Sequence, residues 1–165
     1  MKRRQFMLSL LAVSVAPLLS RHANASPTNS NENIGILHLT DYEWEKRLSP
    51  EQFRVLRDNG TERAHSSPLN HEKRSGTYVC AGCEQPLFSS AMKYDSGTGW
   101  PSFFKALPNA ITTKKEFSMF YTRTEYHCSR CKGHQGHVFG DGPEPTGKRY
   151  CNNGVALKFI SAHLG

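Results

Sequence analysis

Cys80-Ala81-Gly82-Cys83 and Cys128-Ser129-Arg130-Cys131 are two Cys-x-x-Cys turns in a chain of 165 residues. A gap of two residues lets both thiolates of a turn point at one ion, and two such turns supply the four sulfurs of a tetrahedral zinc site. Four sulfurs leave no open position for water or substrate, so this ion would be structural. Two disulfides are the alternative, but a bridge within a Cys-x-x-Cys turn is strained and usually redox-active. The pattern therefore favours one structural Zn²⁺.

Short strands between turns are expected on both sides of these cysteines. The stretches that favour strands are 76–79, 86–88, 117–127, 137–139 and 155–160. Upstream, Thr40 and Glu43 form a capping box ahead of a helix over 42–48. Ser49-Pro50-Glu51-Gln52 begins a second helix, which should stop at Asp58-Asn59-Gly60. The sequence therefore predicts one mainly antiparallel β domain with short N-terminal helices.

Residues 1–25 predict an export signal. Lys2, Arg3 and Arg4 precede a mostly apolar run over 6–19, and Ala23-Asn24-Ala25 has the small residues of a cleavage site. The run is shorter than the ~20 residues of a membrane span, which argues against stable membrane association after cleavage. An uncleaved anchor or a buried helix is the alternative.

The paired arginines favour the twin-arginine route, and thus the bacterial periplasm. A general secretory signal can begin in the same way. The polar, apolar-poor stretch 26–33 predicts a flexible tether over 26–40, which leaves 41–165 as the folded domain.

The charge balance gives little support to a nucleic-acid partner. The whole chain carries a formal charge of +7 with 37% hydrophobic residues, and removing the four basic residues of the signal leaves +3. A charge near +3 is ordinary for a small domain, and the sequence has no clear aromatic and basic stripe. A zinc-ribbon module that binds nucleic acid or protein is nevertheless the main alternative from another functional class. No feature indicates an oligomer, so a monomer is expected.

Cys151 is the cysteine left outside the two turns, within Arg149-Tyr150-Cys151-Asn152-Asn153-Gly154. A neighbouring cation can lower the pKa of a thiol, and amides can hydrogen-bond a polar substrate. A single unpaired cysteine is more often a small buried hydrophobe. A second feature therefore matters: Gly133-His134-Gln135-Gly136-His137 places two histidines three residues apart in a glycine-rich stretch. If four sulfurs saturate the zinc, these histidines are free for acid–base work; ordinary surface histidines or extra metal ligands are the alternatives.

Trp100 stands between Gly99 and Pro101. An indole held stiffly near the surface offers a flat apolar wall that could hold a methyl group, although such a residue more often serves packing.

Taken together, these residues resemble the methionine sulfoxide reductase B family over residues 41–165. The shared motifs are Gly60-Thr61-Glu62, Cys80-Ala81-Gly82-Cys83, Gly99-Trp100-Pro101-Ser102-Phe103, Cys131-Lys132-Gly133-His134-Gln135-Gly136-His137-Val138-Phe139 and Arg149-Tyr150-Cys151-Asn152-Asn153-Gly154. The resemblance implies two antiparallel β-sheets and structural zinc on Cys80, Cys83, Cys128 and Cys131. It also implies reduction of the R epimer of methionine sulfoxide, usually within peptides or proteins.

The resemblance also assigns roles to residues of this chain. Cys151 is the nucleophile, and Arg149 favours its thiolate. The residues that would surround the sulfoxide oxygen are His134, His137 and Asn153. Trp100 would pack on the methyl group of the substrate, and Phe103, in the same motif, would join the substrate site.

One position departs from the family pattern. Many members carry a second catalytic cysteine, which resolves the sulfenic acid, where this chain has Thr98. No spare thiol remains once zinc has taken four. We therefore predict a one-cysteine cycle in which an external thiol, such as that of a thioredoxin-like protein, reduces Cys151. A family member that kept the fold and lost the activity is the alternative.

Overall fold

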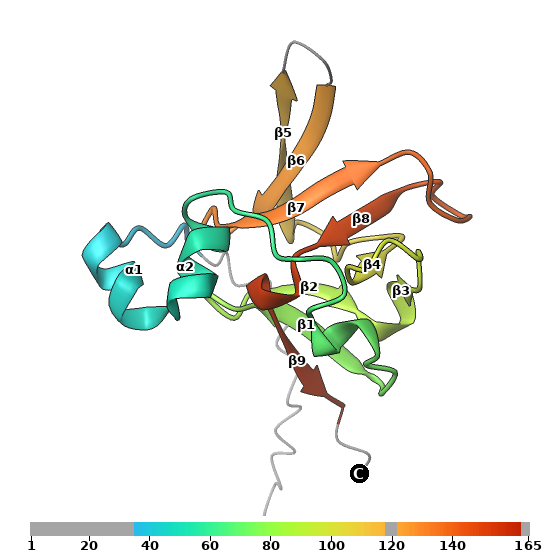
Figure 1. Ribbon diagram of the computed structural model, residues 1–165, viewed down its shortest axis with the longest axis horizontal. Coiled ribbons are helices and arrows are strands. Elements are labelled where there is room, and N and C mark those ends of the chain that lie inside the picture. Colours follow the sequence, from blue (N-terminus) through green and yellow to red (C-terminus); the bar gives the residue numbers. More distant parts are fainter. Residues whose placement is uncertain (1–34, 118–121, 163–165) are drawn as a thin grey trace, which may run out of the picture. The chain divides into compact units, whose positions relative to one another are not determined.

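The computed structural model describes residues 35–117 and 122–162 (Figure 1). The predicted export signal and most of the predicted tether lie outside the described residues, so both stay predictions. Within the described ranges, no helix has the length and apolar character needed to cross a bilayer.

Two short helices open the described domain, α1 (Asp41–Arg47) and α2 (Pro50–Leu56). The predicted capping boxes are both present: Thr40 caps α1 and Ser49 caps α2. Helix α2 ends slightly earlier than predicted, and the left-handed residue is Asn59 (φ 55°). Asn tolerates this conformation better than most side chains because it can hydrogen-bond locally.

The helices bury their apolar side against the two cysteine turns. Trp44 and Leu56 are 1% and 2% exposed. A Cβ placed on Gly82, inside the first turn, would lie 3.5 Å from Trp44 and 3.6 Å from Leu56. The Arg57 guanidinium donates a 3.0 Å hydrogen bond to the carbonyl of Cys131 in the second turn. The helices therefore cover the cysteines.

Within residues 35–117 and 122–162, nine strands form two sheets (Figure 1), and both sheets are antiparallel, as predicted. The smaller sheet has the order β2-β1-β9, and the larger has the order β3-β4-β8-β7-β6-β5. The strands are β1 (Gly76–Cys80), β2 (Pro86–Ser89), β3 (Lys93–Tyr94), β4 (Ser102–Phe103), β5 (Ile111–Phe117), β6 (Thr122–Cys128), β7 (His134–Phe139), β8 (Arg149–Asn152) and β9 (Leu157–Ser161). The described residues also form three single-turn 3-10 helices. Pro68–Asn70 lies between α2 and β1, whereas Ser90–Met92 and Gly154–Ala156 lie between strands.

The prediction of one strand over 117–127 is wrong. Phe117 ends β5 and pairs directly with Thr122, the first residue of β6, so the chain reverses between them. Strand β5 was missed because most of its side chains are exposed, which leaves no alternation of apolar and polar residues to detect. The β5–β6 hairpin projects from the rest of the large sheet (Figure 1).

Aromatic side chains join the two sheets. Phe103 of β4 stacks on Phe88 of β2 with ring centroids 4.1 Å apart, and its edge meets Tyr78 of β1 at 4.9 Å. Tyr126 and Tyr150, from β6 and β8, also contact Phe88. One face of the large sheet therefore forms the core.

The other face of the large sheet carries a row of functional side chains. Cys151 of β8 pairs with Ser102 of β4 on one side and with His137 of β7 on the other, and His137 pairs with Glu125 of β6. Residues directly opposite one another in antiparallel strands point to the same face, and their sequence neighbours point to the other. This is why Cys151 lies outside the core although Tyr150 lies within it.

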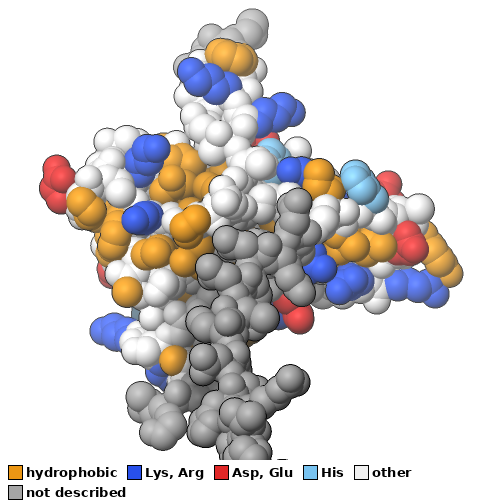
Figure 2. Space-filling model, turned by 180° about the vertical axis from the view of Figure 1, so that it is seen from behind, with side chains coloured by type: hydrophobic (Ala, Val, Ile, Leu, Met, Phe, Trp, Pro, Cys, Tyr) orange, Lys and Arg blue, Asp and Glu red, His pale blue; other side chains and the backbone are white. Residues whose placement is uncertain are grey.

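Charged side chains are mixed over the outer surface. On the face shown in Figure 2, Lys and Arg are spread among hydrophobic and uncharged side chains. Among the described residues visible from this side, no continuous basic stripe follows one element.

Candidate active site

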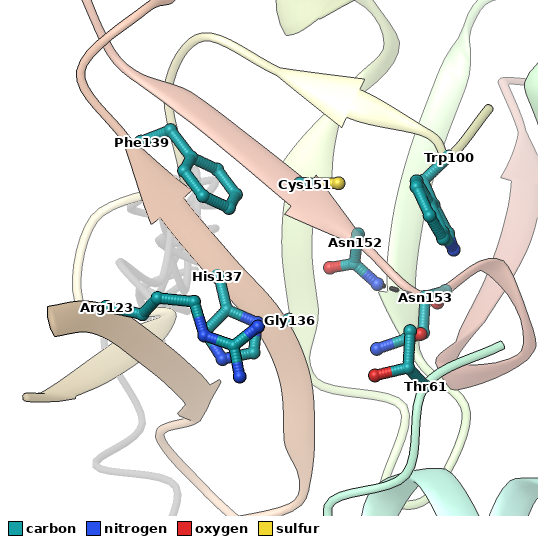
Figure 3. A pocket seen from close by; sticks show the side chains of 9 residues that line it. All are labelled: Thr61, Trp100, Arg123, Gly136, His137, Phe139, Cys151, Asn152 and Asn153. Carbon is teal, nitrogen blue, oxygen red and sulfur yellow. Dashed lines mark hydrogen bonds between the residues drawn. The ribbon is translucent and has the colours of Figure 1, made fainter. Parts of the chain in front are cut away.

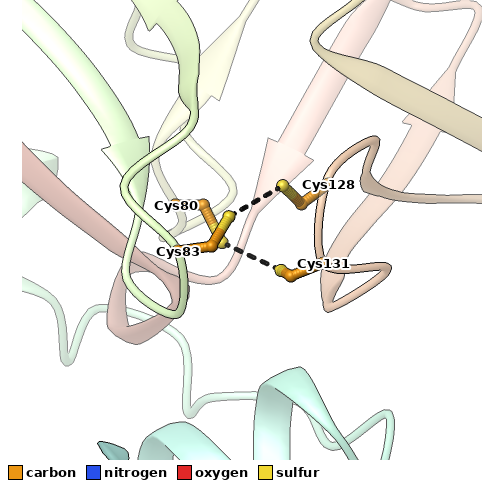
Figure 4. A group of neighbouring side chains, drawn as sticks. All are labelled: Cys80, Cys83, Cys128 and Cys131. Atoms are coloured by element: carbon orange, nitrogen blue, oxygen red, sulfur yellow. Dashed lines mark hydrogen bonds between the residues drawn. The ribbon is translucent and has the colours of Figure 1, made fainter. Parts of the chain in front are cut away.

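The four cysteines of the two turns meet at one buried point (Figure 4). The Cys80 and Cys131 sulfurs are 3.6 Å apart, and those of Cys83 and Cys128 are 3.5 Å apart. All four lie within 4.8 Å of one another. Sulfurs around tetrahedral zinc lie about 3.8 Å apart for Zn–S bonds near 2.3 Å, whereas disulfide sulfurs lie about 2.0 Å apart. The arrangement is therefore compatible with a four-coordinate ion, and all four cysteines are free thiols rather than partners in disulfides.

The two turns share one backbone geometry. Glu84 donates its N–H to the carbonyl of Cys80 (2.8 Å), and Lys132 does the same to Cys128 (3.0 Å). Both donors have positive φ, 64° and 59°. The repeated geometry presents two sulfurs from each side, as a shared ion requires.

A second group of side chains could ligate a metal ion, but the distances within it are those of hydrogen bonds. Glu125 Oε1 lies 2.5 Å from His134 Nδ1 and 2.9 Å from His127 Nε2. Nitrogen and oxygen ligands of tetrahedral zinc would lie about 3.4 Å apart. The observed distances are those of N–H groups donating to a carboxylate. Two imidazoles thus satisfy the buried Glu125.

Cys151 lies in a cavity of about 130 Å³ on the outer face of the large sheet (Figure 3). The cavity brings together four predicted site residues, and the Cys151 sulfur is directed toward the Trp100 side. Its lining consists of Thr61, Trp100, Arg123, Gly136, His137, Phe139, Cys151, Asn152 and Asn153. The cavity therefore offers a thiol, an imidazole, an amide and an indole wall within one small volume.

Glu62 fixes two walls of this cavity. Its carbonyl accepts a 3.0 Å hydrogen bond from the Trp100 indole, and its N–H donates to the Asn153 side-chain oxygen at 2.9 Å. Its carboxylate accepts the N–H of Val155 at 2.6 Å. Asn153 also donates one N–H to the Gln135 carbonyl (3.0 Å). Since an amide nitrogen has two hydrogens, Asn153 retains one N–H for a ligand in the cavity.

Burial raises the pKa of the Cys151 thiol above its ordinary value of 9.0, although Arg149 and a hydrogen bond from Thr98 act in the opposite direction. Arg149 is held in place by two 2.8 Å hydrogen bonds to Asp141 and lies over the Phe139 ring at 4.3 Å. The predicted influence of Arg149 is thus present, but burial outweighs it. At pH 7 most Cys151 is therefore a neutral thiol.

His137 contacts a carboxylate that the sequence did not reveal. Its Nε2 lies 2.9 Å from Glu116 Oε2, which also lies 3.9 Å from the Arg123 guanidinium. The hydrogen bond with His137 lowers the pKa of Glu116, so Glu116 is an anion at neutral pH. Glu116 is on β5, the strand that the sequence did not identify, which is why its partnership with His137 was missed.

Three predicted site residues do not line the cavity: Arg149, which faces Asp141, and the buried residues His134 and Phe103. His134 is 1% exposed and faces Glu125, so its contact with the sulfoxide oxygen stays a prediction. Burial lowers its pKa to about 4, which also makes it a poor proton carrier at pH 7. Its ring does pack beside that of His137, with centroids 5.5 Å apart. Phe103 is fully buried in the core because it pairs with Tyr150 rather than with Cys151, which places it on the opposite face.

Comparison with known proteins agrees with this geometry. The sequence model of the SelR domain matches residues 48–161. The peptide methionine sulfoxide reductase MsrB of Methanosarcina barkeri is 53% identical over 127 residues, covering 76% of this chain and 89% of that protein. The chloroplastic peptide methionine sulfoxide reductase B1 of Arabidopsis thaliana is 43% identical over 158 residues, covering 95% and 77%. The MsrB of Leptospira interrogans is 52% identical over 121 residues, covering 73% and 92%.

These matches span most of this chain and most of each relative. Together with the clustered cysteines and the cavity at Cys151, they show that the chain belongs to the SelR, or methionine sulfoxide reductase B, family.

Proposed function

We propose that this protein reduces the R epimer of methionine sulfoxide in peptides and proteins to methionine, with Cys151 as the nucleophile. One observation carries the proposal. Cys151 lies apart from the other four cysteines and lines a cavity, which it shares with His137, Asn153 and Trp100. The other four cysteines are gathered in the buried cluster. The names of the relatives support the substrate class.

The reaction follows from the positions of these side chains. The Cys151 thiolate attacks the sulfoxide sulfur, His137 donates a proton to the sulfoxide oxygen, and Trp100 packs against the methyl group. The oxygen then passes as hydroxyl from the sulfoxide sulfur to the Cys151 sulfur, and the transient S–S bond breaks with its electron pair going to methionine. The products are methionine and a sulfenic acid on Cys151, so the sulfoxide is reduced and the cysteine sulfur oxidised. Proton donation by a placed side chain contributes ~10²–10⁴-fold. The remaining N–H of Asn153 adds a neutral donor for the same oxygen.

An external thiol completes the cycle. Thr98 occupies the position beside Cys151 and offers a hydroxyl, which hydrogen-bonds to Ser96 at 2.8 Å. A first thiol converts the sulfenic acid to a mixed disulfide and releases water, and a second thiol releases Cys151. A thioredoxin-like protein or a small thiol fits this role.

The cysteine cluster is proposed to hold one structural Zn²⁺. The fit rests on the sulfur separations and on the equivalent backbone of the two turns. A bound ion would cross-link β1 to β6, and α1 and α2 would pack over it. The residues of the 130 Å³ cavity perform the chemistry without it.

Export is proposed on the sequence of residues 1–25 alone. An exported enzyme of this class would repair oxidised proteins outside the cytoplasm. Folding around zinc before transport by the twin-arginine route would protect the four thiolates from oxidation.

The first test is turnover of separate R and S methionine sulfoxide peptides with dithiothreitol. We expect the zinc-containing wild type to reduce the R epimer only, and Cys151→Ser to reduce neither while keeping its zinc and its unfolding midpoint. Activity in Cys151→Ser would refute the assignment of the nucleophile. A folded zinc protein that reduces neither epimer would indicate a non-catalytic member or a binding module.

A further inference from the structure

We propose that the reducing thiol reaches Cys151 from the β4 side of strand β8, through a second cavity that the methionine sulfoxide does not use. The occupant is a low-molecular-weight polar thiol. This inference rests on the proposed function and adds a separate binding site for the second substrate.

The sheet gives Cys151 two distinct sides. Strand β8 lies between β4 and β7, and Cys151 pairs with Ser102 on the β4 side and with His137 on the β7 side. Side chains paired in this way lie about 4.5–5.5 Å on either side of the central one. His137 and Ser102 therefore flank the Cys151 sulfur from opposite directions.

Hydroxyl groups extend the β4 side outward from Ser102. Ser102 Oγ lies 2.8 Å from Ser96 Oγ, which lies 2.8 Å from Thr98 Oγ1. Thr98 lies close enough to Cys151 to lower the pKa of its thiol. Thr98 thus lies against Cys151 on the side away from His137.

A polar cavity of about 390 Å³ opens at this point. Its lining includes Tyr94, Asp95, Ser96, Thr98, Pro143 and Arg149. It shares no lining residue with the 130 Å³ cavity, but its lining contains Thr98 and Arg149, the two side chains that lower the pKa of the Cys151 thiol. A volume of several hundred Å³ is typical of small-molecule sites.

The chemistry of the second step requires access from this side. Reduction of the sulfoxide leaves its oxygen on the Cys151 sulfur, beside His137 and Asn153. An incoming thiolate forms its S–S bond along the line of the S–O bond that breaks, from the end opposite the oxygen. The oxygen leaves with a proton from His137 as water, and the mixed disulfide remains on Cys151. The thiolate must therefore approach past Thr98 and Ser96.

The test blocks the larger cavity with a bulky side chain and leaves the 130 Å³ cavity unchanged. Pro143 is exposed at the rim of the larger cavity, and Glu144 is its exposed neighbour outside the lining. Pro143→Trp and Glu144→Trp are compared with the wild type in two measurements. The first is the burst of methionine formed without any thiol, and the second is the rate at which dithiothreitol removes the resulting sulfenic acid.

We expect equal burst rates in all three proteins. The rate with dithiothreitol should fall at least tenfold in Pro143→Trp and change less than twofold in Glu144→Trp. Rates are expressed per burst equivalent, so partial misfolding does not alter them. If Pro143→Trp gives a normal burst and its rate with dithiothreitol is not slowed, this inference is overturned and the proposed function stands. A wild type without a burst would overturn the proposed function itself. The same rate is then measured with thioredoxin as the reductant. A rate that is unchanged in Pro143→Trp would restrict the cavity to small thiols, as proposed. Slowing of Pro143→Trp with thioredoxin but not with dithiothreitol would overturn the choice of occupant.

A charge test uses a variant that keeps the local fold. Asp95→Asn retains the side-chain oxygen that accepts the Gly97 N–H at 2.9 Å and removes one negative charge from the cavity. The rate with 2-mercaptoethanesulfonate relative to cysteamine should rise about 2- to 3-fold at low salt. An unchanged ratio would overturn the placement of the thiol beside Asp95.

Discussion

Replacing each of the two histidines by alanine should separate stability from catalysis. His137 is 15% exposed at the cavity, and its partner Glu116 is 31% exposed. In His137→Ala, water can solvate Glu116, so the free energy of unfolding should fall by less than about 1 kcal/mol. Loss of the proton donor should slow the methionine burst by ~10²–10⁴-fold, or about 3–5 kcal/mol in the barrier.

His134→Ala should behave in the opposite way. The ring is 1% exposed, and so is Glu125, to which it donates. The change leaves a void in the fold and removes one of two N–H donors from a buried carboxylate, which together should cost about 2–4 kcal/mol of stability. The burst rate of the remaining folded protein should fall less than tenfold, through the weakened packing of His134 on His137.

Urea unfolding of the zinc-containing proteins and a single-turnover burst measure the two effects independently. The reasoning is refuted if His134→Ala keeps the wild-type midpoint and loses more than 100-fold in burst rate. A His137→Ala protein with a nearly normal burst would remove His137 from the proton-transfer step.

Two other outcomes are expected. Phe103→Ala should lose about 3–5 kcal/mol of stability, because Phe103 is fully buried and stacks on Phe88. The KM of the folded fraction should stay within twofold of the wild type. A raised KM at unchanged stability would show instead that Phe103 contacts the substrate. Alkylation by iodoacetamide should follow the Cys151 thiolate with a midpoint above pH 9.0, and Arg149→Met should move that midpoint higher, since it removes the cation that favours the thiolate. A midpoint unchanged in Arg149→Met would contradict the electrostatic role of Arg149.

The sequence predicted those parts of the fold that local chemistry decides. Thr40 and Ser49 are followed three residues later by Glu43 and Gln52, and each pair closes a capping box that needs no tertiary contact. The Cys-x-x-Cys spacing likewise determines the backbone of each turn. Both features were confirmed because a few adjacent residues suffice to form them.

Strand pairing explains the misplaced residues. Phe103 and Cys151 are far apart in the sequence. Only the register of β4 on β8 shows that Phe103 pairs with Tyr150 and therefore faces the core. The polar strand β5 has no apolar alternation, so neither the strand nor the contact of Glu116 with His137 could be inferred. The spacing of His134 and His137 gave no indication that the first faces Glu125, because a register shift in the pairing of β6 with β7 intervenes. The export signal lies outside the described residues and stays a prediction.

The alternation along β8 makes catalytic activity a direct reporter of correct folding. Tyr150 and Asn152, on either side of Cys151, face the core, where their side chains contact Tyr126. A slip of β8 by one position would turn the thiol inward and bring an aromatic or amide side chain to the surface. Misregistered molecules would therefore be inactive and would not show an altered substrate selectivity. Specific activity in a preparation should then count native molecules, and a mutation that loosens this strand should lower the number of active sites while each remaining site works at its full rate.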